Sequence, residues 1–439
     1  MSDAVSSAPT SAATADRLLD RLAPVAASGA RAERGRAFLH AHGLPDHHHE
    51  AWRYTPVADI VAALESARPA PLDDSKTSSI DRHTVDELAG EHGGPRVVFV
   101  NGSLARELSD SDHDAKGVWL GGSEDLAPRR PPGATAPEDE PADGFHALNW
   151  AAGTDVAAVI VEPDAQLDTP VHIVHLAVSG DGVTAMHPRT VVRLGPRSRA
   201  TVIESLVGAG GAPVVNSSTR LLVGEDATLQ YHRVVDGPDE AVHVGRVGVV
   251  QAARSTLDAT ATITAGSIVR TGIDDRLVGD GARSNLRGLY LPVARRRYDN
   301  VVTVDHAASH GTSTQRFKGI VDDHGRGSFS GHVIVRHGTV GNDASQSNPN
   351  LVLSPSAQAD TRPWLEIFAD DVACTHGATV GRLDDDALFY LRSRGIPAAT
   401  ARSMLVAAFA TEILDGIEPP SLRERLLGSL HGLVAEVVP

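Results

Sequence analysis

Cys374 and His376 are the residues whose types and spacing most readily form a chemical site. They lie in the phrase DDVACTHGATVGR (370–382), and Cys374 is the only cysteine of the chain. In an extended strand, residues i and i+2 point to the same side, with their Cα atoms roughly 6.5–7 Å apart. Because thiolate and imidazole are both ligands for iron, this spacing would let the pair bind one metal or sulfur species.

Two other interpretations of this pair stay open. C-x-H is a short pattern, and it is also compatible with a small buried cysteine beside an ordinary hydrogen-bonded histidine. A Cys–His catalytic dyad is the third interpretation, and it requires the imidazole to contact the sulfur. Same-face positions on one strand tend to hold their side chains parallel, so the spacing favours packing over a metal site and a metal site over a dyad.

Other histidines are weaker candidates for metal binding. His47, His48 and His49 form a tract in PDHHHEAWRYTP, for which a solvated loop is favoured over a metal site. His306 and His310 are four residues apart and are expected on one strand face. For this second group, surface residues are favoured over a second metal site.

Composition and charge exclude several classes of protein. The chain has 439 residues, with 40 Lys+Arg against 56 Asp+Glu and a formal charge of −16. So negative a chain is not expected to bind nucleic acid or anionic lipid. A single cysteine cannot form an internal disulfide or a four-thiolate metal site. There is no P-loop, so this chain is not expected to bind a nucleotide by that route.

The distribution of apolar residues predicts the compartment. No apolar run reaches the roughly 18 residues that a membrane helix needs. The first residues lack a basic start followed by an apolar block, so no secretory signal is expected. The lack of cysteine pairs agrees with a reducing compartment. We therefore predict a cytoplasmic protein that does not span a membrane.

A repeated phrase predicts the elements that position Cys374 and His376. Each copy has a small or acidic turn and then alternating apolar and polar residues, and the copies begin at Glu162, Gly195, Gly224, Ala252, Gly279, Asp323 and Ser354. The starts are roughly 30 residues apart, with one longer gap, which is typical of a solenoid. Alternation predicts strands with one face inward. Repetition at near-constant spacing favours a parallel β-helix over a β-sandwich.

Three regions are predicted along the chain. Residues 1–95 form a mostly helical region with a disordered start, helices over 15–22 and 31–41, and a polar linker at 69–79. Residues 96–371 form the β-helix core, interrupted by a Pro-rich insertion at about 127–144.

The third region, residues 372–439, contains the end of the core and three helices. Gly395 to Pro397 separates the first two helices, and Pro419 and Pro420 precede the third. Such helices either cap the sheet, which is the favoured interpretation, or dock a partner.

Three longer phrases give the chain a resemblance to a known family. LEIFADDVACTHGATVGRLDDDALFYLRSRGI (365–396) closely resembles the C-terminal signature of the D-type members of the SufB/SufD family, subunits of the SUF iron–sulfur cluster assembly complex. HEAWRYTP (49–56) and RFKGIVDD (316–323) are similar to further phrases of this family. The resemblance extends over most of the chain and is weakest over the first 40 residues and the Pro-rich insertion.

The resemblance implies a right-handed parallel β-helix with helical ends, a SufB-like β-helix partner, and a SufC-like ABC-type ATPase docked on the C-terminal helices. The functional histidine of the family falls on His376 and the neighbouring cysteine on Cys374. These residues would hold a transient iron–sulfur cluster that is shared with the partner. Asn348 stands where SufB-type chains carry an essential cysteine, which indicates the D-type subunit.

The implied function is that of a non-enzymatic scaffold for cluster assembly. The alternative is a stand-alone β-helix enzyme that acts on carbohydrate or acyl groups. Such an enzyme would need carboxylates clustered at the spacing of the coils, and none of the repeated phrases has them.

Overall fold

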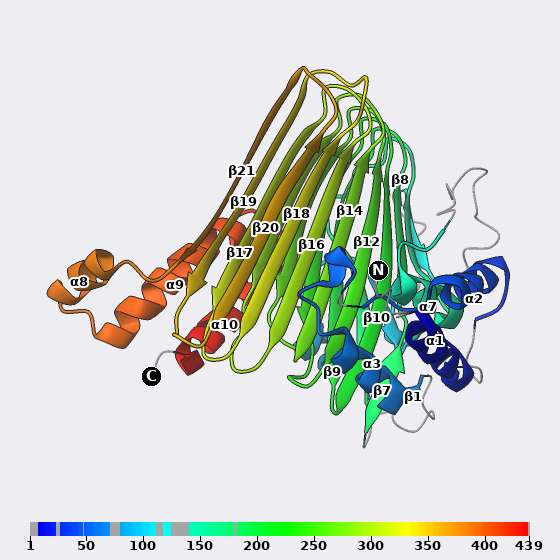
Figure 1. The fold of residues 1–439 in the computed structure, drawn as a ribbon, viewed down its shortest axis with the longest axis horizontal. Coiled ribbons are helices and arrows are strands. Elements are labelled where there is room, and N and C mark those ends of the chain that lie inside the picture. The colour runs from blue at the N-terminus through cyan, green and yellow to red at the C-terminus, as the bar shows by residue number, and fades with distance from the viewer. Residues whose placement is uncertain are drawn as a thin grey trace, which may run out of the picture.

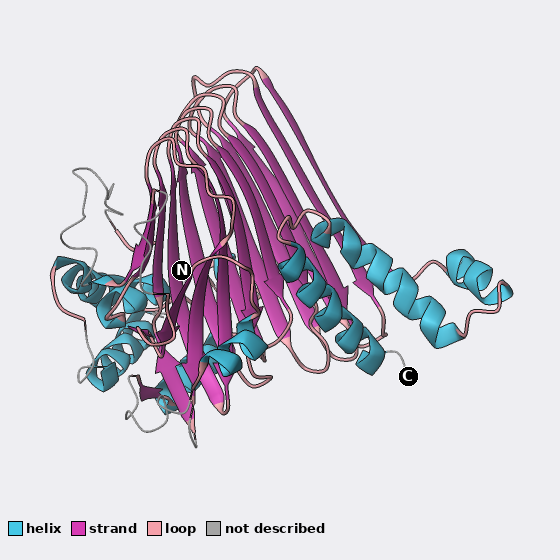
Figure 2. Cartoon of the chain, turned by 180° about the vertical axis from the view of Figure 1, so that it is seen from behind, coloured by secondary structure: helices cyan, strands magenta, loops and turns pink. Residues whose placement is uncertain are grey.

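Two long parallel β-sheets face each other in the computed structural model, and helices lie at both ends of the winding (Figure 1, Figure 2). The structure describes residues 8–22, 27–46, 48–70, 80–110, 117–123, 140–179 and 182–437. The predicted class, a mainly β protein with a parallel β-helix core and helical ends, is confirmed.

The helices form an N-terminal and a C-terminal group. They are α1 (Ala8–Leu22), α2 (Ala30–His42), η2 (Glu50–Trp52), α3 (Val57–Ser66), α5 (Arg82–Ala89), α7 (Gly144–Ala152), α8 (Asp385–Ser393), α9 (Ala398–Leu414) and α10 (Pro420–Val437). The predicted helices over 15–22 and 31–41 are confirmed. Most of the predicted linker and of the Pro-rich insertion lies outside the described residues. Among the residues that are described, no helix has the length and apolar character to cross a membrane.

The strands divide between two sheets. Sheet A contains β1 (Arg68–Pro69), β4 (Val118–Gly121), β5 (Ala157–Val161), β7 (Val183–Met186), β8 (Arg189–Leu194), β10 (Ala212–Val223), β12 (Val242–Gln251), β14 (Ile268–Leu277), β16 (Arg297–His306), β18 (Arg326–Val335) and β20 (Gln358–Ile367). Sheet B contains β2 (Arg96–Val100), β3 (Ser103–Leu104), β6 (Val171–Val178), β9 (Arg199–Ala209), β11 (Thr228–Asp236), β13 (Thr256–Ile263), β15 (Arg283–Tyr290), β17 (Thr312–Val321), β19 (Asn342–Val352) and β21 (Val372–Gly381).

From β9 onward, the chain alternates between the sheets, so that each coil adds one strand to each of them. Val242 of β12 pairs with Ile268 of β14, and Thr256 of β13 pairs with Arg283 of β15, all in parallel register. A coil therefore takes roughly 30 residues, which is the period that the repeated phrases predicted.

The lumen between the two sheets holds the main hydrophobic core. Its inward rows are mostly aliphatic, and Ala200, Leu229 and Leu257 stack on three successive strands of sheet B. Further along, the rings of Phe317 and Phe329 stack with their centroids 5.0 Å apart. Burial of these rows is the main stabilisation of the winding, because no single coil can cover its own apolar face.

A charged pair interrupts the apolar lumen. Glu204 on β9 and Arg233 on β11 form an ion pair in which both side chains are 1% exposed. Tyr231 and Thr219 also donate hydrogen bonds to the Glu204 carboxylate, and Arg233 donates one to Ser217 Oγ at 2.6 Å. Since Thr219 and Ser217 belong to β10, this network joins sheet B to sheet A inside the lumen.

The phrase HEAWRYTP attaches the N-terminal helices to the outer face of sheet A. The Trp52 ring stacks on Phe145 of α7 at a centroid distance of 5.0 Å and lies 3.7 Å from the Arg270 guanidinium. Thr55 and Arg270 both donate hydrogen bonds to the carboxylate of Asp299 on β16. These contacts give the phrase a packing role.

The C-terminal helices α9 and α10 pack on strands of sheet B. Their buried residues, among them Val406, Ile413 and Leu422, form one apolar cluster with Ile203, Leu289 and Ile320 of the strands. Beside this cluster, the phrase RFKGIVDD supplies Lys318, whose side chain is 6% exposed and forms an ion pair with Glu412 of α9. Lys318 also donates a hydrogen bond to the Phe409 carbonyl at 3.0 Å.

We expect Glu412→Ala to lower the free energy of unfolding by about 1–3 kcal/mol, because it leaves the buried Lys318 ammonium without its carboxylate. Arg316→Ala is the matched control, since the Arg316–Glu412 pair is 46% and 48% exposed and such pairs contribute about 1 kcal/mol at most. Urea unfolding measures both variants, and equal losses would contradict the assignment.

The same pair predicts a dependence on pH. The hydrogen bond from Lys318 holds the pKa of Glu412 below its ordinary value. The stabilisation by the Lys318–Glu412 ion pair is therefore complete above the ordinary glutamate pKa near 4.3. It is lost as the pH falls through the lowered pKa of Glu412.

Candidate functional site

Within the described residues, no strand pairs with the outer side of the last coil of the β-helix. Strands β20 and β21, of 10 residues each, end the two sheets. At the other end, the sheets finish with β4 and β3, which have 4 and 2 residues and pair antiparallel. Short edge strands resist pairing with another chain, whereas long ones favour it. We call β20 and β21 together the open end.

Cys374 and His376 lie on β21 and share its lumen-facing side. Cys374 is in register with Ala344 and His376 with Gln346, and the side chains of these two β19 residues are 1% and 4% exposed. Cys374 is half-buried and packs in a small apolar cluster with Val333 and other residues of the preceding coil. His376 is exposed, because β21 is the last strand of sheet B in the described part of the chain.

The surroundings of Cys374 favour its neutral form. Burial raises the pKa of the Cys374 thiol, and the nearby negative charge of Asp343 raises it further. The thiolate is the form that binds metal and reacts as a nucleophile. A metal ion or a positive charge brought to the open end would favour the thiolate form of Cys374.

We expect alkylation of Cys374 by iodoacetamide to rise with pH through a midpoint above the ordinary cysteine pKa near 8.5, because the thiolate is the reacting form. Since the chain has 1 cysteine, mass spectrometry of the intact protein reports this site alone. Asp343→Asn is expected to lower the midpoint, and Asp371→Asn serves as a control for general charge. A wild-type midpoint at or below that of free cysteine would contradict the assigned environment.

Cys374 and His376 alone would be an incomplete ligand set for a metal cluster. Within the described parts of the chain, no three His, Cys, Asp or Glu side chains come together to hold a metal ion. The irons of a cluster usually take several thiolates. A cluster bound at the open end would need further ligands from outside the described residues.

The fold separates the other histidine candidates. His47 lies outside the described residues, and His48 and His49 directly precede η2. The prediction that His306 and His310 share an exposed strand face is wrong. His306 ends β16, is fully buried and hydrogen-bonds through Nε2 to a serine hydroxyl at 2.8 Å. His310 follows in a turn at a φ of 59°, which breaks the strand alternation.

Large apolar side chains are exposed at the open end and on the helices after it. They are Ile367, Phe368, Val380, Phe389, Tyr390 and Met404. Helix α8 has no buried residue and projects from the body of the molecule (Figure 1). Sequence patterns did not single these residues out, since their exposure depends on how the last strands and the helices after them pack. Exposed apolar surface of this kind is typical of a protein–protein contact.

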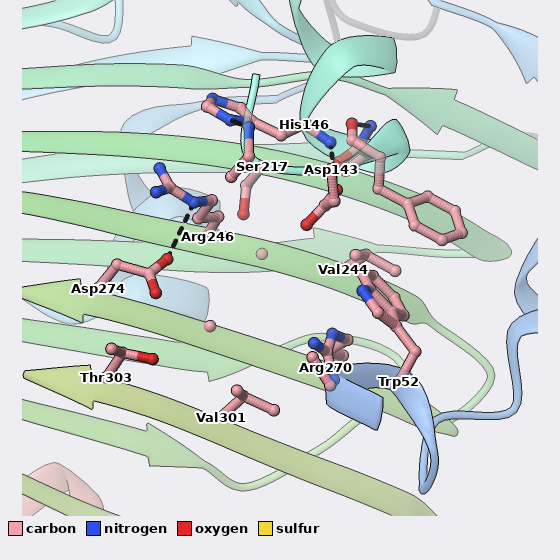
Figure 3. Close-up of a pocket in the computed structure, with 16 residues that line it drawn as sticks. Trp52, Asp143, His146, Ser217, Val244, Arg246, Arg270, Asp274, Val301 and Thr303 are labelled. Carbon is pink, nitrogen blue, oxygen red and sulfur yellow. Dashed lines mark hydrogen bonds and ion pairs between the residues drawn. The ribbon is translucent and has the colours of Figure 1, made fainter. Parts of the chain in front are cut away.

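A recess of about 190 Å³ lies on the outer face of sheet A, beside the N-terminal helices (Figure 3). Arg246 and Asp274 form an ion pair there at 3.0 Å. The Asp143 carboxylate accepts a hydrogen bond from the His146 N–H at the start of α7, at 2.8 Å. Since these charged and polar groups pair with one another, the recess is a joint between the helices and sheet A. It shares no lining residue with the open end.

Comparison with known proteins agrees with this architecture. The family described as "SUF system FeS cluster assembly, SufBD core domain" matches residues 175–409, a span from within β6 to within α9. This parallel β-helix chain belongs to the SufBD family of iron–sulfur cluster assembly proteins.

Within that family the chain is SufD-like. It is 29% identical to the iron–sulfur cluster assembly protein SufD of Escherichia coli K12 over 391 residues, which cover 88% of this chain and 89% of that protein. A SufBD family protein of Synechocystis is 28% identical over 87% of this chain and 86% of its own length. A SufBD family protein of Mycobacterium bovis is 31% identical over 66% of this chain and 74% of its own length. The resemblance found in the sequence is confirmed.

Proposed function

We propose that the chain is a non-enzymatic scaffold subunit that contributes His376, with Cys374 beside it, to a cluster-assembly site shared with a SufB-like β-helix subunit. The observation that carries the proposal is the open end, where His376 is exposed on the lumen side of the last strand. The iron–sulfur cluster is transient cargo at this site. Incomplete ligation by this chain favours its later release to an acceptor.

The open end has the features that a second β-helix would recognise. Main-chain N–H and C=O groups along β20 and β21 are available for pairing with strands of another chain. Ile367 and Val380, which are 40% and 52% exposed, would be covered in such a contact. The partner would bring its own ligands next to His376, so that the cluster is bound across the interface.

The C-terminal helices are proposed to dock a SufC-like ABC-type ATPase in the cytoplasm. Phe389 and Tyr390 of α8 are 72% and 56% exposed, and α9 is anchored to the β-helix through Glu412 and Lys318. A force that the ATPase exerts on these helices would thus be transmitted to β17. ATP turnover would then move the two β-helix subunits and open the shared site.

Co-expression of the chain with a SufB-like subunit and a SufC-like ATPase tests the proposal. We expect a stable complex that contains both β-helix subunits and retains iron and acid-labile sulfide after anaerobic purification. The double variant Phe389→Ser/Tyr390→Ser on α8, a helix with no buried residue, is expected to release the ATPase while the two β-helix subunits stay together. A chain that purifies alone from this mixture, or that turns over a carbohydrate or acyl substrate by itself, would contradict the scaffold role.

A further inference from the structure

A row of side chains inside the lumen leads to His376. Gln315 of β17, Gln346 of β19 and His376 of β21 occupy the same inward position on three successive strands of sheet B. The Gln315 side chain is fully buried, and that of Gln346 is 4% exposed. Because neighbouring strands are about 4.8 Å apart, each side chain of such a row lies within reach of the next.

The side-chain amides of Gln346 and Gln315 are joined by a hydrogen bond. Gln346 donates a hydrogen bond from Nε2 to Gln315 Oε1 at 3.2 Å, and Gln315 donates one from Nε2 to the His332 carbonyl at 3.4 Å. In a planar carboxamide, Oε1 and Nε2 lie on opposite sides of the Cγ–Cδ axis, so Gln346 Oε1 does not share the direction of Nε2 toward the coil of Gln315. That oxygen is buried and has no hydrogen-bond partner in the described part of the chain. Native structures rarely leave such an acceptor unpaired.

The neighbouring inward positions of β19 offer no free acceptor. Ala344, in register with Cys374, has no polar side-chain atom. Asn348, in register with Ala378, donates to the Phe317 carbonyl at 2.8 Å, and its Oδ1 accepts from Asn350 at 2.8 Å. Of these three side chains, Gln346 alone presents an unused acceptor to the last coil.

We propose that Gln346 is a positioning residue for His376. When the partner covers the open end, Gln346 Oε1 accepts a hydrogen bond from one ring N–H of His376, and the other ring nitrogen is left as the acceptor that binds iron. A neutral imidazole has one nitrogen of each kind, and a histidine that binds metal usually donates its second N–H to an oxygen. The amide row thereby fixes the tautomer and the orientation of the ring. This inference rests on the proposed function of His376.

Three variants of the full chain, each in complex with its partner subunits, test the role of Gln346. Anaerobic titration with Fe²⁺ measures the affinity of each complex. We expect Gln346→Leu to weaken binding about tenfold, because the acceptor is lost. Gln346→Glu keeps an acceptor oxygen and is expected to stay within about threefold of wild type. Gln315→Leu removes the amide that accepts from Gln346 Nε2 but keeps the acceptor oxygen of Gln346, so it is expected to weaken binding less than Gln346→Leu does.

Thermal unfolding separates this role from a structural one. If Gln346 only stabilises the fold, the buried carboxylate of Gln346→Glu should lower the melting temperature at least as much as leucine does. The iron affinities of the variants would then fall in the same order as their melting temperatures. Retained iron affinity in a less stable Gln346→Glu complex supports the proposal. Unchanged affinity in Gln346→Leu, or equal losses in the Leu and Glu variants, overturns it.

A crystal structure of the wild-type complex distinguishes this inference from the function on which it rests. A distance of about 2.7–3.2 Å between Gln346 Oε1 and a His376 ring nitrogen is expected. If that contact is present but His376→Ala retains the cluster, the positioning contact stands and the proposed function fails. If Gln346 Oε1 bonds to another group, the positioning role fails whatever the effect of His376→Ala.

Discussion

His376→Ala is expected to lower the iron and acid-labile sulfide retained by the assembled complex about tenfold or more, because it removes the imidazole that faces the shared site. Loss of a group that merely supports a metal ligand costs about 10–100-fold in affinity, and His376 is proposed as a ligand itself. The measurement is iron and sulfide per complex after anaerobic purification. The change leaves the fold intact, since an exposed side chain contributes little to stability, about 0.5 kcal/mol at most.

Thr375→Ala provides the matched control for His376. Thr375 is the preceding residue on β21, is exposed, and is in register with the outward-facing Ser345 instead of a lumen residue. We expect Thr375→Ala to retain wild-type amounts of iron and sulfide. If both variants lose the cluster equally, the loss results from disturbing the edge strand β21, and the imidazole has no particular role. If His376→Ala retains the cluster, the site assignment is wrong.

Glu204→Leu is expected to lower the free energy of unfolding by about 3–5 kcal/mol, because it leaves the Arg233 guanidinium buried without a counter-charge. Arg233 is 1% exposed, so water cannot replace the lost carboxylate. Urea unfolding at neutral pH measures the loss. The double variant Glu204→Leu/Arg233→Met removes both charges and is expected to be more stable than the single variant. Equal stabilities of the single and double variants would show that the isolated Arg233 charge does not cause the loss.

The Glu204 network also predicts behaviour in acid. Burial raises the pKa of Glu204, but the charge of Arg233 outweighs it and holds the pKa well below the ordinary value. Protonation would therefore break the network. The stabilisation is complete above the ordinary glutamate pKa near 4.3 and is lost as the pH falls toward the lowered value. Glu204→Leu should show a flatter decline in stability below that pH than the wild type.

The architecture of this chain could be predicted from local patterns because a β-helix repeats one local unit. The phrases that begin at Gly195 and Gly224 fall on β9 and β11, and their alternation matches the inward rows of sheet B. Cys374 and His376 lie on β21, where their i, i+2 spacing places them on one side of the strand. The pattern failed at His310, where a turn with a positive φ interrupts the alternation.

Contacts between distant segments could not be predicted in this way. Lys318 and Glu412 are 94 residues apart, and nothing in the phrase around either residue identifies the other. The unpaired oxygen of Gln346 depends on the direction of one amide within a stacked row. The exposure of His376 follows from β21 being the last strand of sheet B. These features depend on packing, and no local sequence signal encodes them.

The difference between the two ends of the β-helix limits how large an assembly can grow. A solenoid with two long unpaired ends would add copies without limit and form fibres. A solenoid with one long unpaired end can pair only once through that end. In the proposed pairing, two β-helices joined at their open ends would leave the short described strands β3 and β4 of this chain at its outer tip, so growth would stop at a pair. Each copy without a partner keeps its open end exposed. If the proposed pairing holds, a cell would therefore benefit from producing this chain and its β-helix partner in equal amounts.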